Sequence, residues 1–166
     1  MVVINCLPRE GTMKAFVSLV ALVVVASGQA LAQGGQDASA VCAMAERHYA
    51  AIRAGDMNTV LQQHLPEFTF FTGDSGLLWT FRSLDQQRAE YLETAPSFSF
   101  KTYIRHCTAQ VYGNTGIATY YLVGSVAIGN NTSTGTWRVT EVWVRQGNEW
   151  KEAHHHESPL LGSVRP

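Results

Sequence analysis

The C-terminal stretch of the chain concentrates side chains that can carry out proton transfer. His154, His155 and His156 are consecutive, in a strand that begins near Glu149. Period-2 alternation puts His154 and His156 on one face with Trp150 and Glu152, and these polar groups suit the wall of a cavity. Neutral imidazoles act as general bases or hydrogen-bond donors, and Glu141 lies on the strand before them. We therefore expect His154, His156 and Glu141 as the candidate catalytic residues, with His155 on the other face.

The same histidine pair also suits a metal site or a structural role. An i, i+2 pair on a strand ligates a metal when a third ligand converges on it, and His106 or Glu141 is a candidate for that ligand. The pair can instead form a hydrogen-bonded wall of a pocket, which is the interpretation that the sequence favours. We accordingly predict no metal and no cofactor.

Aromatic side chains and one arginine are the candidate ligand-binding residues. They are Tyr49, Trp79, Tyr103, Arg138 and Trp150. Each aromatic has core packing as its alternative. An arginine inside a cavity can hold an anionic group by a bidentate contact, and the alternative for Arg138 is a carboxylate on a neighbouring strand or water.

The penultimate strand leaves open which of its faces lines a cavity, because both faces mix apolar and charged residues. One face carries Arg138, Thr140, Val142 and Val144, and the other carries Trp137, Val139, Glu141, Trp143 and Arg145.

Composition limits the classes of protein to which the chain can belong. Of the 166 residues, 46% are hydrophobic and 15% are charged, which is typical of one globular domain. The formal net charge of −1 gives no electrostatic basis for binding nucleic acid or an anionic membrane.

Residues 1–32 have the pattern of a secretory signal peptide. Lys14 precedes an apolar run, and small residues at Ala30 and Ala32 form a cleavage site. A membrane anchor is the alternative, but the apolar run is short for a span. The signal fits better if translation starts at Met13.

Signal cleavage defines the expected organisation of the mature protein. We expect a linker over residues 33–38 and one domain over residues 39–162. The mature protein is expected in the periplasm or outside the cell, free of the membrane.

The mature chain has helical patterns first and strand patterns afterwards, which indicates an α+β fold. The expected helices cover residues 37–54, 56–63 and 83–94, and two short strands are expected over 67–72 and 77–81. Four long strands are expected over 97–112, 116–128, 134–145 and 149–157, separated by Gly-Asn turns.

This order of elements resembles the nuclear transport factor 2-like superfamily, and so do two local motifs. One is the helix that ends in Ala54-Gly-Asp56; the other is Val142-Trp143, then Trp150, then His154-x-His156-x-Ser158. The most similar branches are the SnoaL-like proteins and the association domain of calcium/calmodulin-dependent kinase II. The resemblance implies a cone in which helices pack on a curved, mostly antiparallel sheet around a pocket.

Steroid isomerases on this fold use a carboxylate base and a tyrosine donor. By the resemblance, the base position falls on Phe71 and Thr72, and the donor position falls on His48, one residue before Tyr49. Asp74 lies two residues beyond the base position and fits a turn better. The missing carboxylate argues against a steroid isomerase of the known kind.

Two functions remain open, both with a small-molecule ligand as the partner. The first is an exported ligand-binding or oligomerisation module with a polar and aromatic cavity. The second is a SnoaL-like enzyme doing isomerase, dehydratase or hydrolase chemistry on a small, mostly apolar substrate. We expect a homodimer in either case, because the outer face of a long sheet carrying Val and Trp would otherwise expose an apolar patch.

The mature chain contains two cysteines, Cys42 and Cys107. Cys42 lies on the apolar stripe of the first helix, and Cys107 lies in a strand that this helix should cover. Export to an oxidising compartment favours a disulfide between them, and two separate buried thiols are the alternative.

Overall fold

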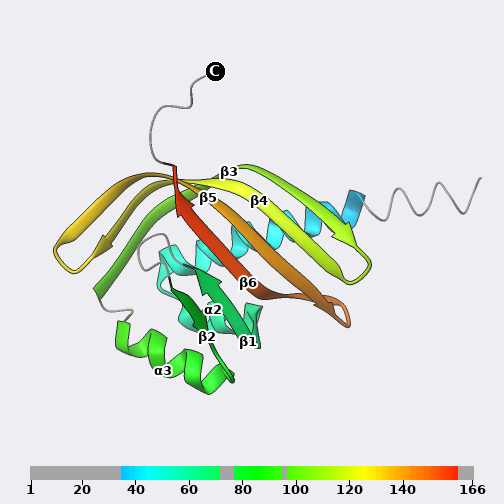
Figure 1. The fold of residues 1–166 in the computed structure, drawn as a ribbon, viewed down its shortest axis with the longest axis horizontal. Helices are drawn as coiled ribbons and strands as arrows, with labels where there is room; N and C mark the ends of the chain where they lie inside the picture. The colour runs from blue at the N-terminus through cyan, green and yellow to red at the C-terminus, as the bar shows by residue number, and fades with distance from the viewer. Residues whose placement is uncertain (1–34, 72–76, 95–96, 161–166) are drawn as a thin grey trace, which may run out of the picture. The chain divides into compact units, whose positions relative to one another are not determined.

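The helices and strands follow the predicted order in a computed structural model that describes residues 35–71, 77–94 and 97–160 (Figure 1). A long helix covers residues 35–54, α2 covers Met57–Gln63 and α3 covers Leu84–Thr94. The strands are β1 (His64–Phe71), β2 (Leu78–Thr80), β3 (Phe98–Tyr112), β4 (Thr115–Ile128), β5 (Asn131–Gln146) and β6 (Glu149–Pro159). The predicted α+β class is confirmed.

The two short helices begin where their capping residues predict. The Asp56 carboxylate accepts a hydrogen bond of 3.1 Å from the backbone N–H of Thr59, which caps α2. The Ser83 hydroxyl accepts one of 3.1 Å from the backbone N–H of Gln86, and the Gln86 side chain accepts one from Arg82 N–H.

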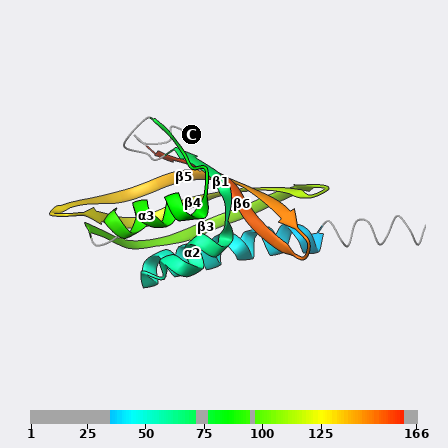
Figure 2. The same cartoon turned by 90° about the horizontal axis from the view of Figure 1, so that it is seen from below.

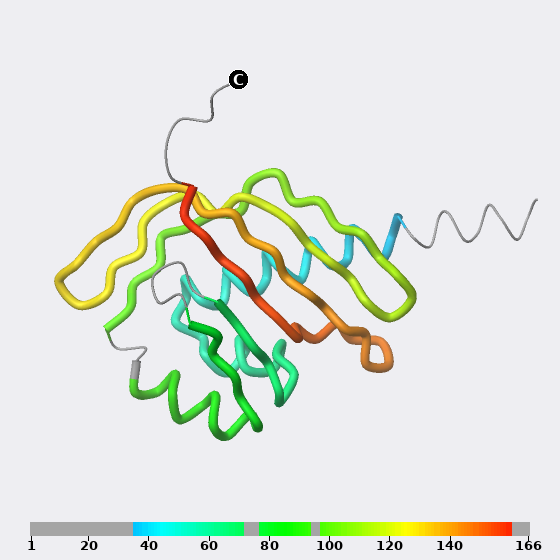
Figure 3. The backbone as a smooth tube through the Cα atoms, in the orientation of Figure 1, coloured from blue at the N-terminus to red at the C-terminus, as the bar shows by residue number. Residues whose placement is uncertain are grey.

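The six strands form one sheet in the order β2-β1-β6-β5-β4-β3. All neighbours are antiparallel except β1 and β6, which run parallel. The last strand of the chain therefore lies between β1 and β5, inside the sheet (Figure 3). Its side chains can reach residues of both halves of the domain.

The long helix lies against one face of the long strands and contributes to the core (Figures 1 and 2). Its buried stripe includes Val41, Ala45 and Tyr49, which pack with Trp143 and Trp150 from β5 and β6. The helix approaches the sheet closely at Gly116 on β4, where a Cβ atom would lie 2.6 Å from a methyl group of Val41.

A β-bulge in β3 changes which residues of that strand face the helix. The register with β4 shifts between Arg105 and Thr108, and His106 has a positive φ of 57°. Ile104 is buried before the bulge, whereas Cys107 packs against the core after it. The bulge is therefore what turns Cys107 toward the helix.

The structure joins the two cysteines of the expected mature chain as a disulfide. The Cα atoms of Cys42 and Cys107 are 6.0 Å apart, inside the limit of about 7 Å that a disulfide can bridge. The bond ties the long helix to β3 across a sequence separation of 65 residues.

Several expectations for the N-terminus fall outside the described part of the chain. Residues 1–34, which contain the expected signal peptide and the start at Met13, lie outside it, as does part of the expected 33–38 linker. Among the described helices, none is both long and apolar enough to cross a membrane. All described residues except 35 and 36 belong to one unit, Asp37–Pro166.

Candidate functional site

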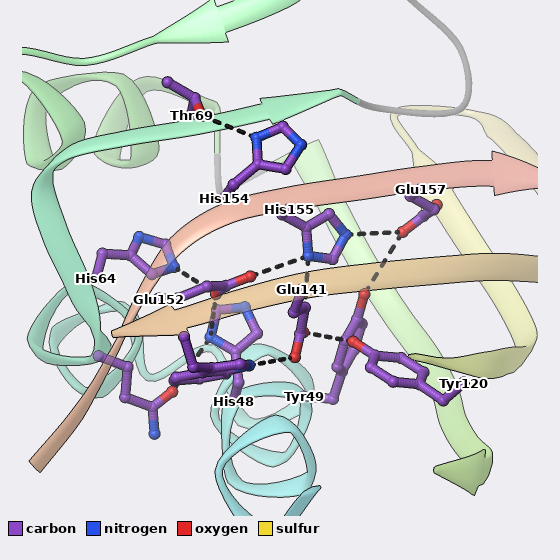
Figure 4. A network of polar contacts seen from close by, with 12 residues as sticks. His48, Tyr49, His64, Thr69, Tyr120, Glu141, Glu152, His154, His155 and Glu157 are labelled. Carbon is purple, nitrogen blue, oxygen red and sulfur yellow. Dashed lines mark hydrogen bonds and ion pairs between the residues drawn. The ribbon is translucent and has the colours of Figure 1, made fainter. Parts of the chain in front are cut away.

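A cluster of titratable side chains lies inside the domain, between the helices and the sheet (Figure 4). Five elements contribute to it: the long helix, β1, β4, β5 and β6. We call it the polar cluster, and its members are His48, Tyr49, His64, Tyr120, Glu141, Glu152, His155 and Glu157. The side chains of Glu141 and Glu152 are both 0% exposed. A carboxylate buried this deeply needs hydrogen bonds or a charged partner to be tolerated.

Glu141 obtains its partners from three strands. One carboxylate oxygen accepts a short hydrogen bond from the Tyr120 hydroxyl, and the other accepts one of 2.8 Å from Trp143 Nε1. The Nδ1 atom of His155 lies 3.6 Å from the first oxygen. Glu141 is thus held by donors on both of its oxygens.

Glu152 is surrounded by three imidazoles, but its two oxygens differ. Oε1 lies 3.2 Å from Nδ1 of His155 and forms a hydrogen bond with it. Oε2 lies 3.4 Å from Nε2 of His64 and 3.7 Å from Nδ1 of His48. Neither Oε2 nor His64 Nε2 has a hydrogen-bond partner among the described residues. One side of this carboxylate is therefore satisfied and the other is not.

The two buried histidines near Oε2 of Glu152, His64 and His48, each contact the side-chain amide of a glutamine through Nδ1. Nδ1 of His64 lies 3.0 Å from Oε1 of Gln87, and Nδ1 of His48 lies 3.2 Å from Oε1 of Gln63. The ring of His64 also stacks on Phe68, with ring centroids 3.9 Å apart. These contacts fix the position of the His64 ring.

Burial and close contacts move the pKa values of neighbouring groups in opposite directions. Burial, followed by the charge of Glu152, raises the pKa of Glu141. Burial also opposes ionisation of Glu152, but its pKa is lowered because interactions with His48 and His155 outweigh burial. For His155, hydrogen bonds to Glu141 and Glu152 outweigh burial and raise the pKa well above 6.5. Burial lowers the pKa of His48 to about 4. Such divergence is typical of functional sites, although structural ion-pair networks also produce it.

A second bulge explains why His155 belongs to the polar cluster. The β5–β6 register passes from Trp143↔Glu152 to Val142↔His154, so Ala153 is an extra residue in β6. Trp150 and Glu152 face inward before the bulge, whereas His155 and Glu157 face the cluster after it. The bulge reverses the alternation along the second half of the strand.

His154 and His156 do share a face opposite His155, but the prediction that this is the face of Trp150 and Glu152 is wrong. Thr69 on β1 and Nδ1 of His154 form a hydrogen bond of 2.8 Å (Figure 4). The Phe71 ring contacts both His154 and His156 edge-on. His155, expected on the other face, occupies the interior position instead. The catalytic role expected for His154 and His156 stays a prediction.

The face of β5 that the sequence left open is settled by burial. Trp137, Val139, Glu141 and Trp143 are buried, and Arg138 on the opposite face is exposed. The inward face therefore brings Glu141 into the polar cluster.

Comparisons with known proteins agree with this fold and its order of elements. The family model for the SnoaL-like domain matches residues 41–162. The chain belongs to the SnoaL-like domain family. No curated protein sequence matches it at a significant level.

Solved structures similar to this SnoaL-like domain share its fold at low sequence identity. An NTF2-like protein from Cytophaga hutchinsonii is 13% identical with a TM-score of 0.63, covering 74% of this chain and 97% of that one. A protein from Streptomyces avermitilis proposed as an NTF2-like dehydratase is 18% identical with a TM-score of 0.65, covering 77% and 99%. The Chlamydomonas reinhardtii CaMKII hub homology domain is 21% identical with a TM-score of 0.59, covering 75% and 98%.

The other predicted ligand-binding residues of the SnoaL-like domain divide into two groups. Tyr49 is buried within the cluster, and Trp150 is buried beneath the guanidinium of Arg145, 4.5 Å from its ring centroid. Trp79 is 39% exposed on β2, and Tyr103 is 51% exposed on β3 under Arg53. The structure thus brings Tyr49 and Glu141 together and leaves Trp79, Tyr103 and Arg138 outside the cluster.

Six cluster members were not among the predicted site residues: His48, His64, Tyr120, Glu152, His155 and Glu157. His48 had a signal, because the resemblance described above puts it at the tyrosine donor position of steroid isomerases. Glu152 alternates with Trp150 and so had the right face. His64 had no signal, because only the parallel pairing of β1 with β6 brings it opposite Glu152.

The steroid isomerase positions can be located only in part. Phe71, at the expected base position, lies on β1 beside His154 and His156. Thr72 and Asp74 fall outside the described residues. Within the described part of the chain, two groups of three side chains have ligand atoms close enough to hold a metal ion. His48, His64 and Glu152 form one, and Glu141, Glu152 and His155 form the other.

Proposed function

We propose that this SnoaL-like domain is a small-ligand-binding module whose ligand contacts Tyr49, His155 and Glu157. The observation that supports this is a set of long contacts at the least buried edge of the polar cluster. The Tyr49 hydroxyl lies 3.5 Å from Glu157, and His155 Nε2 lies 3.7 Å from the same carboxylate oxygen. Glu157 is 20% exposed and His155 is 11% exposed. A polar ligand that enters here can replace weak contacts with stronger ones.

The charges at this edge favour a ligand with hydrogen-bond donors. Three carboxylates, of Glu141, Glu152 and Glu157, surround the imidazole of His155. An excess of carboxylates repels an anion and attracts an ammonium or hydroxyl group. We therefore propose a small amine or polyol as the ligand class. Arg138 lies on the exposed face, so it is not placed to hold an anion in the cluster.

Ligand-observed NMR with small amines, polyols and carboxylic acids tests this proposal. Amines or polyols should bind, and Glu157→Gln or Tyr49→Phe should weaken binding by about tenfold, which corresponds to about 1.4 kcal/mol. Arg138→Ala is the matched control on the outer face and should leave binding unchanged. Preferential binding of carboxylic acids, lost in Arg138→Ala, would contradict the proposal.

Acid/base catalysis is a second candidate, favoured by the position of His155. Both of its ring nitrogens lie within 3.7 Å of carboxylate oxygens, an arrangement that orients an imidazole for proton transfer. The Streptomyces avermitilis neighbour proposed as a dehydratase is consistent with this candidate. Each ligand found by NMR should be incubated with a stoichiometric amount of the protein. Conversion of the ligand that is abolished by His155→Gln supports an enzyme. A ligand that stays unchanged supports the binding module.

We also propose that the domain forms a homodimer through the outer face of its sheet. Tyr103, Tyr121 and Val123 are all more than a third exposed, and strand register puts them on one face. Two neighbours in the structure comparison are CaMKII hub domains. Light scattering after size exclusion should give twice the chain mass, and Val123→Asp should halve it. A monomer at micromolar concentration would contradict this.

We also propose that the protein is exported from the cytoplasm. Export is supported by the signal-peptide pattern of residues 1–32 and by the geometry of the Cys42–Cys107 pair, since disulfides persist in oxidising compartments. In a bacterial host, mass spectrometry of the exported protein should find an N-terminus at Gln33 and no alkylated cysteine without reduction. Retention in the cytoplasm with residues 1–32 attached would contradict export.

A further inference from the structure

The orientation of Gln87 decides which nitrogen of His64 carries the proton. Gln87 is 0% exposed, and its Nε2 donates hydrogen bonds of 2.8 Å and 3.0 Å to the carbonyl oxygens of Leu65 and Pro66. Its Oε1 must therefore be the atom that faces His64, and it can only accept. The Nδ1 atom of His64 donates this hydrogen bond, so in the neutral imidazole Nε2 holds a lone pair.

That lone pair points at another acceptor. Nε2 of His64 lies 3.4 Å from Oε2 of Glu152, and the two side chains are 1% and 0% exposed. Neither atom has a hydrogen-bond partner among the described residues. Two buried acceptors that face each other need a positive charge between them.

A third potential ligand atom nearby, on His48, makes a metal ion the best candidate for that charge. Nδ1 of His48 lies 3.7 Å from the same oxygen of Glu152, and all three ligand atoms lie within 4.8 Å of one another. Donor atoms at about 2.1 Å from a tetrahedral zinc ion are about 3.4 Å apart. The two distances to Glu152 Oε2 are close to this value.

We propose that His48, His64 and Glu152 bind one Zn²⁺ ion, with the fourth position open to water or a ligand. Two imidazoles and one carboxylate form a ligand set of zinc sites that keep an open position. Gln87 is then the outer partner that orients His64, and His155 holds the other oxygen of Glu152 at 3.2 Å. The site uses other atoms than the ligand edge at Glu157, so it does not depend on the function proposed above.

To ligate the zinc ion through Nδ1, His48 must carry its ring proton on Nε2 instead of Nδ1. Its Nδ1 atom contacts Oε1 of Gln63 at 3.2 Å, and it can ligate only when the ring proton is on Nε2. Zinc binding therefore replaces the hydrogen bond to Gln63 with a metal bond. A proton on His64 Nε2 is the alternative to the metal, and it predicts that the protein does not bind zinc.

Calorimetric titration of the chelator-treated, folded protein with Zn²⁺ tests the proposal. One ion should bind per chain and raise the melting temperature. His64→Ala and Glu152→Gln should each weaken binding by about 100-fold or more, and Gln87→Ala by about 10-fold to 100-fold. The matched control is the double variant His154→Ala/His156→Ala, which removes the histidines outside the polar cluster and should bind as the unaltered protein does.

Two outcomes of the titration overturn the proposal: no binding by the unaltered protein, or binding that the His154/His156 double variant loses and His64→Ala keeps. Because a cluster variant can fail to fold, a second measurement uses the unaltered protein alone. Added Co²⁺ should give the intense visible absorption of a tetrahedral site, and added Zn²⁺ should shift the side-chain NMR signals of His48 and His64. Shifts confined to His154 and His156 would place the ion elsewhere and also overturn it.

Discussion

The two halves of the long helix face different interiors. Val41, Cys42 and Ala45 in the first half meet tryptophans, small side chains and the disulfide partner on β3. His48 and Tyr49 in the second half meet histidines and glutamates from β1, β5 and β6. We call these regions the apolar end and the polar end. Apolar burial and a cross-link stabilise the fold at one end, and this allows the other to bury charged groups that cost free energy.

Removing the disulfide should produce the largest loss of stability and should affect only the apolar end. A cross-link that closes 65 residues stabilises by about 4 kcal/mol in the chain-entropy model. Cys42→Ser/Cys107→Ser should therefore lower the free energy of unfolding by about 4 kcal/mol in urea denaturation. Zinc affinity of the folded fraction should not change. If zinc binding is lost while the protein remains folded, the two ends are not separate.

Removing the donor of a buried carboxylate should give the next largest effect, at the polar end. Tyr120→Phe takes a hydrogen bond from Glu141, which is fully buried. Hydrogen bonds to charged groups contribute about 1.5–3 kcal/mol, and we expect a loss of that size in urea denaturation. Tyr121→Phe, on the exposed side of the same strand, is the control and should change stability little. Equal losses in the two variants would show that the buried contact contributes nothing.

Adding a methyl group at Gly116, where the long helix packs closely on β4, should destabilise the apolar end less than loss of the disulfide does. Gly116→Ala places a methyl group against Val41, and overpacking of this kind costs about 1–3 kcal/mol. Combining it with Val41→Ala should recover part of that loss, because the second change removes the methyl groups in the way. A double-mutant cycle by thermal denaturation measures the coupling, and strict additivity would show that the two residues do not compete for space.

A change outside both ends should have the smallest effect. Asp56→Ala removes the N-cap of α2 and should cost about 1 kcal/mol of stability. Zinc binding and ligand binding should stay as they are. Asp56→Ser retains a capping oxygen and should recover most of the loss; a failure to do so would show that the effect does not come from the cap.

The fold was more predictable than the site, and the bulges explain the difference. Capping residues, helical spacing and Gly-Asn turns are local signals, and they gave the helices and strands with boundary errors of a few residues. Strand alternation gave the correct face for Trp150. It then failed beyond Ala153, because alanine carries no signal for a bulge. The convergence of His48, His64 and Glu152 depends on the pairing of β1 with β6, which no local pattern encodes.

The placement of the last strand inside the sheet has a consequence for the order of folding. The contact between His64 and Glu152 cannot form until Glu152, which follows by 152 − 64 = 88 residues along the chain, has been synthesised. The long helix, β3 and β4, with both cysteines, are synthesised before β6, and domains of this size acquire long-range strand pairs late. A nascent chain can therefore close its covalent cross-link while it still lacks Glu152, His155 and Glu157 of the polar cluster. A ribosomal product that stops before Glu149 would keep the cysteine pair and contain neither Glu152 nor His155.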